Sequence, residues 1–594
     1  MVTARFGLTR EILDLSGFWR FRIDPEGVGE REEWFNCSTS LRSWDKLYVP
    51  ANWNEQCSKY TWYMGTVWYA KDFFVPKDWV ESAVTLCFEG VNYKAKVWVN
   101  GSYLGEHEGG FTSFSFRVEK FLRFGGMNRT VIMVDNTLSR KTIPPGENMN
   151  RTYFDFFHYG GIYREVFLST YPKIHVSDVT IKTDIQGEDG IVNVDAKITN
   201  ELDRPYDGTL KAQIIFEDEI VCENTQPLII QPFSEVIEKL EFRVREARFW
   251  DVRAPNLYNL RILLLRDEEI VDEASERFGI RTVKVENTKI LLNGKPVFLK
   301  GFGRHEDFPI LGKALNGAIL RRDFDLMVAL GANSFRTTHY PYSRTHLDLA
   351  DENGFLVILE IPTVGIFKSE TKGVERLDDP ELIEKAKRML KEAIQRDKNR
   401  PSVIMYSLFN EPSSDKPEFL VFLRELVEEA RRLDSSRPVT FVSNRVENAE
   451  GVLDLIDVIC QNIYYGWYFN FGDLETSRRL LKETLETLHA KQPNKPIIVT
   501  EFGAEAIAGL HSDPPEMWTE EYQAEFIRTY WEVLTSTDYV AGGHIWNFAD
   551  FRTPQGVLRT ILNRKGIFTR TREPKYSTKV VKELFTKTPD HRLA

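Results

Sequence analysis

The chain has 594 residues, of which 42% are hydrophobic and 28% are charged, and its formal net charge is −11. This composition is typical of a soluble globular protein with several domains, and it excludes a disordered chain, a collagen and a bundle of membrane helices. The net negative charge also argues against a nucleic acid or a membrane surface as partner.

Cysteine usage and the N-terminal segment bear on where the protein works. The five cysteines are scattered and never form a Cys-x-x-Cys pair, so the sequence indicates neither a disulfide framework nor a zinc site. The first 21 residues contain Arg5, Arg10, Glu11 and Asp14 and lack the apolar stretch of a signal peptide. We therefore expect a cytoplasmic protein.

Residues 1–173 read as an all-β domain. Tyr93, Ala95, Val97 and Val99 alternate with more polar residues, and the run ends in Asn100-Gly101, a strong signal for a β-hairpin. Further strands are expected at 111–118 and 130–134, and few helical periods occur. The pattern predicts a β-sandwich of the jelly-roll type.

Residues 174–284 form a second β-rich block. Val192, Val194, Ala196 and Ile198 alternate with polar residues, and turn signals such as Asp207-Gly208 recur at the spacing of a sandwich. About a hundred residues of short strands predict an immunoglobulin-like β-sandwich.

From residue 285 to residue 594 strands alternate with helices. The clearest helix begins at Asp379-Pro380 and places its apolar residues on one stripe. Eight strands in this rhythm predict a catalytic (β/α)8 TIM barrel. A doubly wound sheet is the alternative, but no Gly-x-Gly-x-x-Gly follows the first strand. The expected strands are 297–301, 334–337, 356–359, 403–407, 439–442, 458–461, 497–500 and 543–546.

The carboxyl ends of these strands carry an unusual set of polar, acidic and aromatic side chains. Active sites of such barrels lie at this end, so one crowded rim indicates an enzyme rather than a structural barrel. The rim residues are Arg304, His305, Arg336, His339, Glu360, Asn410, Glu411, Asn462, Tyr464, Tyr468, Glu501, Trp546 and Asn547.

Two glutamates stand out on this rim. Glu411 follows the fourth strand and Glu501 the seventh, each after an apolar run, and these strands lie across the barrel from one another. A retaining glycosidase needs two such carboxyls about 5–5.5 Å apart, one as nucleophile and one as acid and then base. Like charge and partial burial are expected to raise the pKa of one of them, Glu411. As an isolated acid, either residue would more often cap a helix or form a core ion pair.

The chain resembles glycoside hydrolase family 2 over its whole length, and within that family the β-glucuronidases. The motifs that carry the resemblance are 302–307 (Phe-Gly-Arg-His-Glu-Asp), Asn410-Glu411-Pro412 and Thr500-Glu501-Phe502-Gly503-Ala504. The resemblance implies a jelly roll, an immunoglobulin-like sandwich and a barrel in that order. It also implies that Glu501 is the nucleophile, that Glu411 is the acid/base, that Asn410 holds the sugar 2-hydroxyl and that Tyr464 touches the nucleophile.

A smaller segment bears on the sugar. Asn563-Arg564-Lys565 resembles the Asn-x-Lys segment with which β-glucuronidases grip the sugar carboxylate, and Trp546 and Arg559 precede it in the family's order. An amide and an ammonium supply directed, charge-assisted donors for a carboxylate. Asp155 matches the jelly-roll acid that reaches the sugar pocket, although a plain turn residue there is equally well supported.

The segment between Gly365 and Asp379 is short and polar, whereas many gut-bacterial β-glucuronidases have a longer loop over the mouth of the site. We therefore expect a mouth that is open enough for the end of a longer glycan.

Metals and cofactors are not expected. His305 and His339 lack the spacing of metal ligands, so a role in lining the site or in hydrogen bonding is favoured. The resemblance further implies a homo-oligomer, with a tetramer favoured over a dimer, and a glucuronide as the substrate, either a small conjugate or a glycan end.

The sequence therefore predicts a retaining hydrolase that removes terminal β-D-glucuronic acid. Asp155, His305, Asn410, Asn462, Tyr464, Tyr468, Trp546, Arg559, Asn563 and Lys565 are expected to bind the sugar. Two alternatives stay open: a β-galactosidase or β-galacturonidase on the same scaffold, and a non-catalytic carbohydrate-binding protein, against which the intact pair of glutamates argues.

Overall fold

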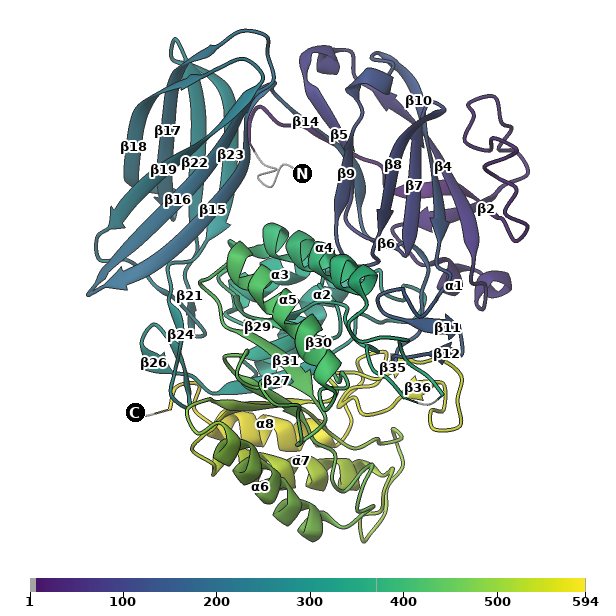
Figure 1. Ribbon diagram of the computed structural model, residues 1–594, viewed down its shortest axis with the longest axis vertical. Coiled ribbons are helices and arrows are strands. Elements are labelled where there is room, and N and C mark those ends of the chain that lie inside the picture. Colours follow the sequence, from purple (N-terminus) through teal and green to yellow (C-terminus); the bar gives the residue numbers. More distant parts are fainter. Residues whose placement is uncertain (1–6, 370, 593–594) are drawn as a thin grey trace.

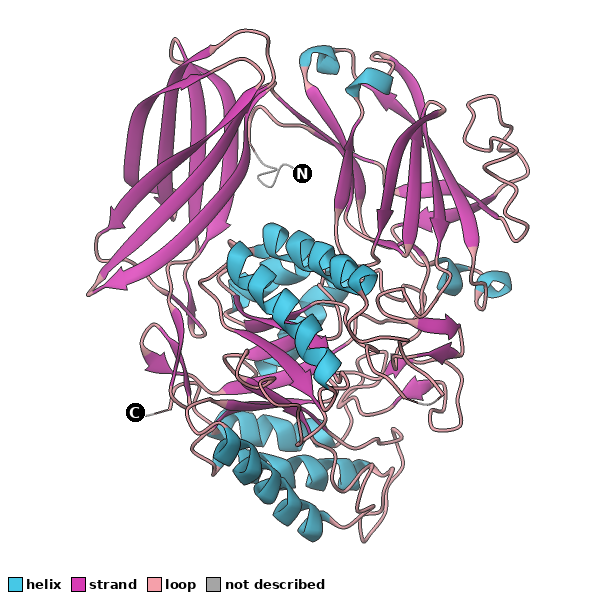
Figure 2. Ribbon diagram, in the orientation of Figure 1, coloured by secondary structure: helices cyan, strands magenta, loops and turns pink. Residues whose placement is uncertain are grey.

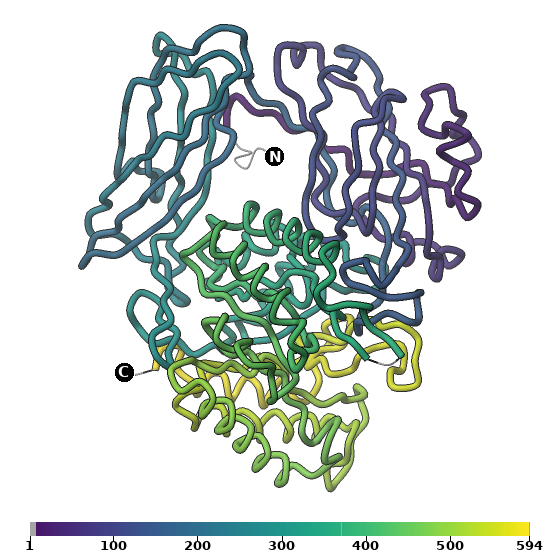
Figure 3. Tube along the Cα trace, viewed as in Figure 1, coloured from purple at the N-terminus to yellow at the C-terminus, as the bar shows by residue number. Residues whose placement is uncertain are grey.

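The computed structural model describes residues 7–369 and 371–592. Two β-sandwiches lie side by side above a barrel (Figure 1), and the long helices of the chain gather around that barrel (Figure 2). The Cα trace in Figure 3 follows the chain from the purple sandwich through the blue one into the barrel. The predicted fold class, a jelly roll, an immunoglobulin-like sandwich and a TIM barrel, is confirmed.

The first sandwich packs a four-stranded sheet against a six-stranded one around a core of aromatic and branched apolar residues. The predicted hairpin at Asn100-Gly101 is present, with both residues at positive φ as a tight two-residue turn requires. The first sheet has the order β1 (Ile12–Asp14), β14 (Val166–Tyr171), β5 (Ala83–Phe88), β9 (Phe114–Arg117); the second has β3 (Asp45–Val49), β2 (Gly17–Ile23), β4 (Thr66–Val75), β10 (Gly126–Asp135), β7 (Lys94–Val99), β8 (Ser102–Glu108).

The second sandwich buries one face of each of its two sheets. In β16 (Asp189–Asn200) the predicted alternation is observed, because Val192, Val194, Ala196 and Ile198 are buried while their neighbours are more exposed. One sheet has the order β15 (Ile174–Gln186), β16, β19 (Ser234–Val244); the other has β18 (Glu219–Ile230), β17 (Tyr206–Phe216), β22 (Tyr258–Arg266), β23 (Glu269–Phe278).

Eight parallel strands close into a barrel, each paired with the next along the chain and the last with the first. All eight lie where the sequence predicted them, with small shifts at their ends. The first begins at Leu299 rather than Val297, because Val297 pairs instead with His591 in an isolated bridge. The strands are β27 (Leu299–Arg304), β28 (Ser334–Thr337), β29 (Leu356–Glu360), β30 (Val403–Asn410), β31 (Val439–Ser443), β32 (Ile459–Asn462), β33 (Ile497–Phe502) and β34 (Val540–Ile545).

Helices follow seven of the eight strands. The predicted helix α4 (Pro380–Asp397) has Asp379 as its N-cap, whose side chain accepts a hydrogen bond from the backbone N–H of Glu381. No α-helix lies between β31 and β32, so residues 444–458 depart from the regular alternation that the sequence suggested. The other helices are α2 (Gly317–Ala329), α3 (Arg344–Asn353), α5 (Pro417–Leu433), α6 (Leu474–Lys491), α7 (Glu520–Thr535) and α8 (Ser577–Lys587).

One end of the barrel is closed and the other is left open. A small sheet of β24 (Val283–Glu286), β25 (Lys289–Leu292) and β26 (Lys295–Pro296) places Ile290 and Leu292 in one apolar cluster with barrel residues such as Ile358 and Ile498. The jelly roll instead contacts the carboxyl-end rim, where Arg164 pairs with Glu306 at 3.0 Å. Segments of the first domain therefore reach the site.

Short elements complete the connections. The pair β35 and β36 brackets an exposed loop, residues 553–561, at the open end of the barrel. The short elements are α1 (Trp53–Gln56), η1 (Ser58–Tyr60), η2 (Asp78–Glu81), η3 (Glu119–Phe121), β6 (Val91–Asn92), β11 (Gly146–Asn148), β12 (Arg151–Thr152), β13 (Gly161–Ile162), β20 (Trp250–Asp251), β21 (Ala254–Pro255), β35 (Phe551–Arg552) and β36 (Leu562–Asn563).

Candidate active site

A cavity of about 560 Å³ opens at the carboxyl ends of the barrel strands. The jelly roll contributes to its wall through residues 152–155, so the site is built from two domains. Nine of the twelve catalytic and sugar-binding residues that the sequence predicted line this cavity: Asp155, Asn410, Glu411, Tyr464, Tyr468, Glu501, Trp546, Arg559 and Asn563.

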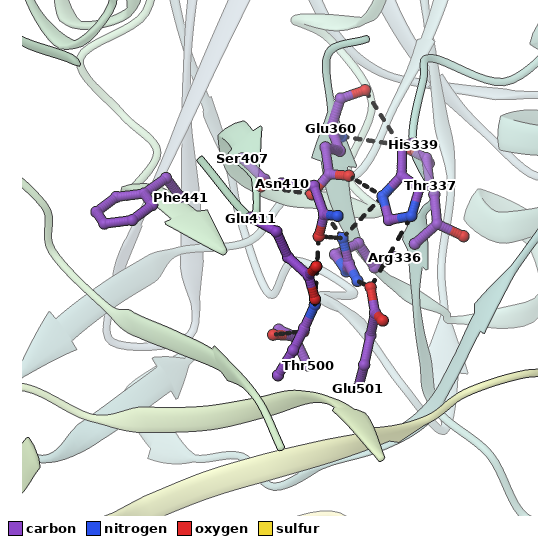
Figure 4. A network of polar contacts seen from close by, with 12 residues as sticks. Arg336, Thr337, His339, Glu360, Ser407, Asn410, Glu411, Phe441, Thr500 and Glu501 are labelled. Carbon is purple, nitrogen blue, oxygen red and sulfur yellow. Dashed lines mark hydrogen bonds and ion pairs between the residues drawn. The ribbon is translucent and has the colours of Figure 1, made fainter. Parts of the chain in front are cut away.

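Glu501, on β33, is held by a cation and a phenol. Its Oε1 accepts a short hydrogen bond from Nη2 of Arg336, and its Oε2 accepts one of 2.8 Å from the hydroxyl of Tyr464. Nε2 of His339 lies 3.9 Å from Oε1 (Figure 4). Both oxygens are fixed by donors, so the carboxylate has one orientation toward the cavity.

Arg336 is completely buried between two carboxylates. Its Nη1 lies 2.7 Å from Oε2 of Glu360, which also accepts hydrogen bonds of 2.7 Å from Ser407, while Oε1 of Glu360 accepts one from His339. Burial disfavours the charged form of Glu360, but Arg336 and His339 outweigh it and hold the pKa of this carboxyl below its ordinary value. Glu360 therefore keeps Arg336 charged and in place behind Glu501.

Glu411 directly follows β30, and the side chains that donate hydrogen bonds to it are neutral amides. Its φ of 51° lies in the left-handed region, and its backbone N–H bonds to the carbonyl of Val442 at 2.8 Å. Its two carboxyl oxygens accept hydrogen bonds from the side-chain amides of Asn462, at 2.8 Å, and Asn444, at 3.1 Å. Burial, followed by the negative charge of Glu501, raises the pKa of Glu411 from 4.5 to about 7.

The two glutamates thus face one cavity in opposite electrostatic environments. Glu501 is paired with the buried guanidinium of Arg336, whereas Glu411 receives only amide donors. A cation favours an ionised carboxylate, and a desolvated site beside a like charge favours a protonated one. The geometry is therefore suited to one anionic and one protonated carboxyl near neutral pH, the division of roles that acid-assisted displacement needs.

Two asparagines occupy the space beside these acids. Asn462 is fixed on three sides, because its Oδ1 accepts from Thr500 at 2.9 Å and its Nδ2 donates to Glu411 and to Oδ1 of Asn410. Oδ1 of Asn410 also accepts from Arg336 at 3.3 Å, while Nδ2 of Asn410 has no partner among the described residues. That amide nitrogen is therefore available to a ligand in the cavity.

At another part of the wall, two cations meet two carboxylates. Arg559 bonds to Asp155 at 2.8 Å, to the hydroxyl of Tyr468 at 2.7 Å and, through a short contact, to Glu505. Lys565 donates to the same hydroxyl at 2.7 Å and to Glu505 at 3.2 Å. The positive charges on this side of the site are therefore matched by negative ones.

Stacked rings form the floor near β34. The indole of Trp546 and the imidazole of His339 lie parallel, with their centroids 5.3 Å apart. His305 stands behind Trp546, where its Nδ1 lies 3.0 Å from the hydroxyl of Tyr340 and its ring contacts Phe551. Burial lowers the pKa of His305 well below its ordinary value, so the ring is neutral.

The described part of the chain contains neither a cluster of metal ligands nor a helix that could span a membrane. Within residues 7–369 and 371–592, no three His, Cys, Asp or Glu side chains come together in a way that would hold a metal ion. Of the helices in this part of the chain, none has both the length and the apolar character needed to cross a bilayer.

Three family models together match nearly the whole chain. The sugar binding domain of glycosyl hydrolases family 2 matches residues 12–172, the family's own central model matches 174–281, and its TIM barrel domain matches 283–589. The chain belongs to glycosyl hydrolases family 2. The resemblance predicted from the sequence is confirmed.

Individual members of the family are similar over their full length. A beta-glucuronidase of Paenibacillus borealis is 38% identical, with 97% of each chain covered, and the human beta-glucuronidase is 34% identical, with 98% of this chain and 91% of the relative covered. The solved beta-D-glucuronidase of Dictyoglomus thermophilum superposes with a TM-score of 0.89 at 37% identity, covering 100% of both chains. A Ruminococcus gnavus b-glucuronidase in complex with D-glucuronic acid gives a TM-score of 0.90 at 34% identity, covering 98% and 100%.

In this family 2 chain, three expected binding residues lie outside the cavity wall. Asn462 contacts Glu411 from behind, His305 supports Trp546, and the side chain of Lys565 is completely buried against Glu505 and three aromatic rings. Asn563 does line the cavity, and its Nδ2 donates to Asp155 at 2.9 Å.

The structure also shows functional candidates that the sequence reasoning missed. The sequence puts Arg336 on the rim but assigns it no role, and only the structure shows that it is buried between Glu360 and Glu501. Asn444 and Arg445 follow β31, the strand end at which the sequence shows no catalytic motif, and both line the cavity. Glu505, four residues after Glu501, gave no periodic signal, and only the fold brings it to Arg559 and Lys565.

Proposed function

We propose that this protein is a retaining β-glucuronidase that removes terminal β-D-glucuronic acid from glucuronides. The observation that carries the proposal is the pair of glutamates in one cavity, Glu501 hydrogen-bonded to the buried guanidinium of Arg336 and Glu411 with a pKa raised to about 7. The similarity to beta-glucuronidases over nearly the full chain supports the same conclusion.

In the first step, an oxygen of Glu501 attacks the anomeric carbon as the bond from that carbon to the leaving oxygen breaks. The proton of Glu411 passes to the leaving oxygen, so the aglycone departs neutral and a glycosyl ester of Glu501 is formed. Asn410 supports this step, because its free amide nitrogen is available to the sugar 2-hydroxyl.

In the second step, the carboxylate of Glu411 takes a proton from water, and the water oxygen attacks the anomeric carbon. The ester bond breaks, Glu501 regains its negative charge, and β-D-glucuronic acid leaves with retained configuration. Esterification of Glu501 removes the charge that helps to keep Glu411 protonated, so Glu411 becomes a base when a base is needed.

We propose that Arg559, Asn563 and Lys565 recognise the sugar carboxylate, with Asp155 and Tyr468 positioning them. Lys565 acts from behind the wall, since its ammonium has three donors and only two are used by Tyr468 and Glu505. Tyr464 orients Glu501, Asn462 orients Glu411, and Trp546, supported by His305, provides an aromatic floor for the sugar ring.

A panel of nitrophenyl glycosides on the purified protein tests the substrate class. We expect the β-glucuronide to be hydrolysed far faster than the β-galactoside, β-galacturonide or β-glucoside. A faster β-galactoside or β-galacturonide would favour the alternative enzymes. Turnover that disappears in Glu501→Ala excludes a non-catalytic binding protein, whereas turnover that survives this change contradicts the proposed nucleophile.

The assembly and location of the enzyme stay predictions. The homo-oligomer, with a tetramer favoured over a dimer, is tested by light scattering on the purified protein after size-exclusion chromatography. The predicted cytoplasmic location is tested by fractionating the cells that produce it.

A further inference from the structure

The cavity has a second basic region near its mouth, distinct from the Arg559 side. Lys372, from the loop after β29, and Arg445, from the segment after β31, both line the cavity that contains the two glutamates. Phe367, five residues before Lys372 in the same loop, also lines it. We call Lys372 and Arg445 the outer cation pair.

Arg445 and the loop that carries Lys372 both lie close to Glu411, since the backbone N–H of Lys368 bonds to the hydroxyl of Ser413, two residues after Glu411. Asn444 donates to Oε2 of Glu411, and Arg445 is the next residue along the chain. The proton of Glu411 goes to the oxygen that joins the sugar to its aglycone, so groups beside Asn444 face the aglycone. Arg559 and Asn563, in contrast, are bound to Asp155 elsewhere on the wall.

The charges of the two basic regions are balanced differently. Arg559 and Lys565 are matched by Asp155 and Glu505. Near Arg445, the carboxylate of Asp415 lies 3.2 Å from Nε of Arg445 and also 3.2 Å from Nζ of Lys416, so one negative charge serves two positive ones. Arg445 is therefore less fully neutralised than Arg559, in a chain whose net charge is −11.

An aromatic surface accompanies the outer cation pair. Nζ of Lys372 lies 5.4 Å from the centre of the Phe367 ring, and the rings of Phe367 and Tyr153 are 5.8 Å apart. The loop is tied down, because the backbone N–H of Val374 bonds to Phe367 and that of Lys368 bonds to the hydroxyl of Ser413. A flat ring can therefore rest against a preformed wall with its substituents near two cations.

We propose that this region is a leaving-group subsite for an aglycone whose ring carries an anionic group, a carboxylate or a sulfate. The inference rests on the proposed function, because it places the aglycone relative to Glu411. Phe367 and Tyr153 contact the ring of the aglycone, and Lys372 and Arg445 attract its anionic group. The same chemistry occurs in acidic aryl conjugates and in sulfated glycan ends.

A matched pair of substrates tests the subsite without changing the chemistry of the leaving oxygen. The 4-(carboxymethyl)phenyl β-glucuronide carries a carboxylate, and its 4-(carbamoylmethyl)phenyl analogue carries a neutral amide of the same shape. The methylene group insulates the phenol, so both leaving groups have similar acidity. We expect kcat/KM to be about three- to tenfold higher for the acid, the effect of two partly exposed cations.

Variants then assign the preference to the outer cation pair. In Lys372→Ala/Arg445→Ala the ratio of kcat/KM for the acid to that for the amide should fall to about one, because both cations are lost. Lys416→Ala is the control, since it removes an equal charge from the same Asp415 but outside the cavity wall. It should keep most of the preference. Raising the salt concentration should weaken the wild-type preference, since the cations are exposed to solvent.

A second pair of substrates distinguishes the two sources of the anion. It carries glucuronate on an N-acetylhexosamine with or without a sulfate. Preference for the sulfated sugar indicates a glycan end, and preference for the aryl acid indicates a small conjugate; either supports the subsite. A ratio near one in both pairs, or a ratio unchanged in the double variant, overturns it. Failure to hydrolyse even the neutral amide glucuronide would instead contradict the proposed function.

Discussion

Replacing Glu501 by Gln should lower the pKa of Glu411. The ordinary pKa of this carboxyl, 4.5, is raised to about 7 by burial and by the charge of Glu501. Two carboxylates about 5–5.5 Å apart repel each other by about 3 kcal/mol at an effective dielectric constant of 20, or about two pH units. Because burial is the larger cause and stays in place, we expect the pKa to fall by about one to two units and to remain above 4.5.

The titration can be followed by NMR on protein labelled with 13C at the glutamate carboxyl. The signal of Glu411 is the one that is absent from the Glu411→Gln spectrum. In the wild type the same group should also set the basic limb of kcat/KM: the enzyme needs protonated Glu411, so activity should fall as pH rises through about 7.

Glu505→Gln is the matched control. It neutralises a buried carboxylate of the same site, but one that pairs with Arg559 and Lys565 rather than facing Glu411. The pKa of Glu411 should hardly change in this variant. A pKa of Glu411 that is the same in Glu501→Gln as in the wild type would refute the electrostatic coupling on which the proposed exchange of roles depends.

Three further outcomes are expected. Glu411→Gln should be more stable than the wild type at pH 8 but not at pH 4.5. The pKa of Glu411 is higher in the folded than in the unfolded protein, so ionisation of Glu411 destabilises the fold once the pH exceeds the unfolded pKa, and glutamine cannot ionise. Equal melting temperatures of the two proteins at pH 8 would contradict this. Lys565→Ala should lower kcat/KM on the glucuronide by roughly 30- to 4,000-fold but hardly change the slow rate on the glucoside. Lys575→Ala, which removes an equally buried lysine paired with Asp550, is the control for damage to the fold. If Lys565→Ala lowered the rates on both sugars in parallel, the role of Lys565 would be structural. Arg336→Met leaves the carboxylates of Glu360 and Glu501 without their buried cation, so kcat should fall at least about a hundredfold and the melting temperature should also fall. An unaltered kcat would show that Arg336 does not hold the nucleophile.

The sequence by itself determined the architecture and pointed to the two glutamates that we propose as the reacting pair. Alternation of buried and exposed residues marks the strands of both sandwiches, and the strand–helix rhythm marks the barrel, because these patterns follow from the geometry of neighbouring residues. Glu411 and Glu501 could be found because each ends an apolar strand, and a barrel brings all such ends to one rim.

Only the tertiary structure decided how these residues are surrounded. Arg336 reaches Glu501 across 165 positions of sequence, and Arg559 meets Asp155 across 404, in another domain. The sequence indicated Lys565 as a partner of the sugar carboxylate, but only the fold shows that its side chain is buried beside Glu505. Ion pairing and burial depend on which distant segments pack together, so the periodicity of the sequence does not indicate them. Ion pairing and burial in turn decide which of the two glutamates is charged, and therefore which reaction each can perform.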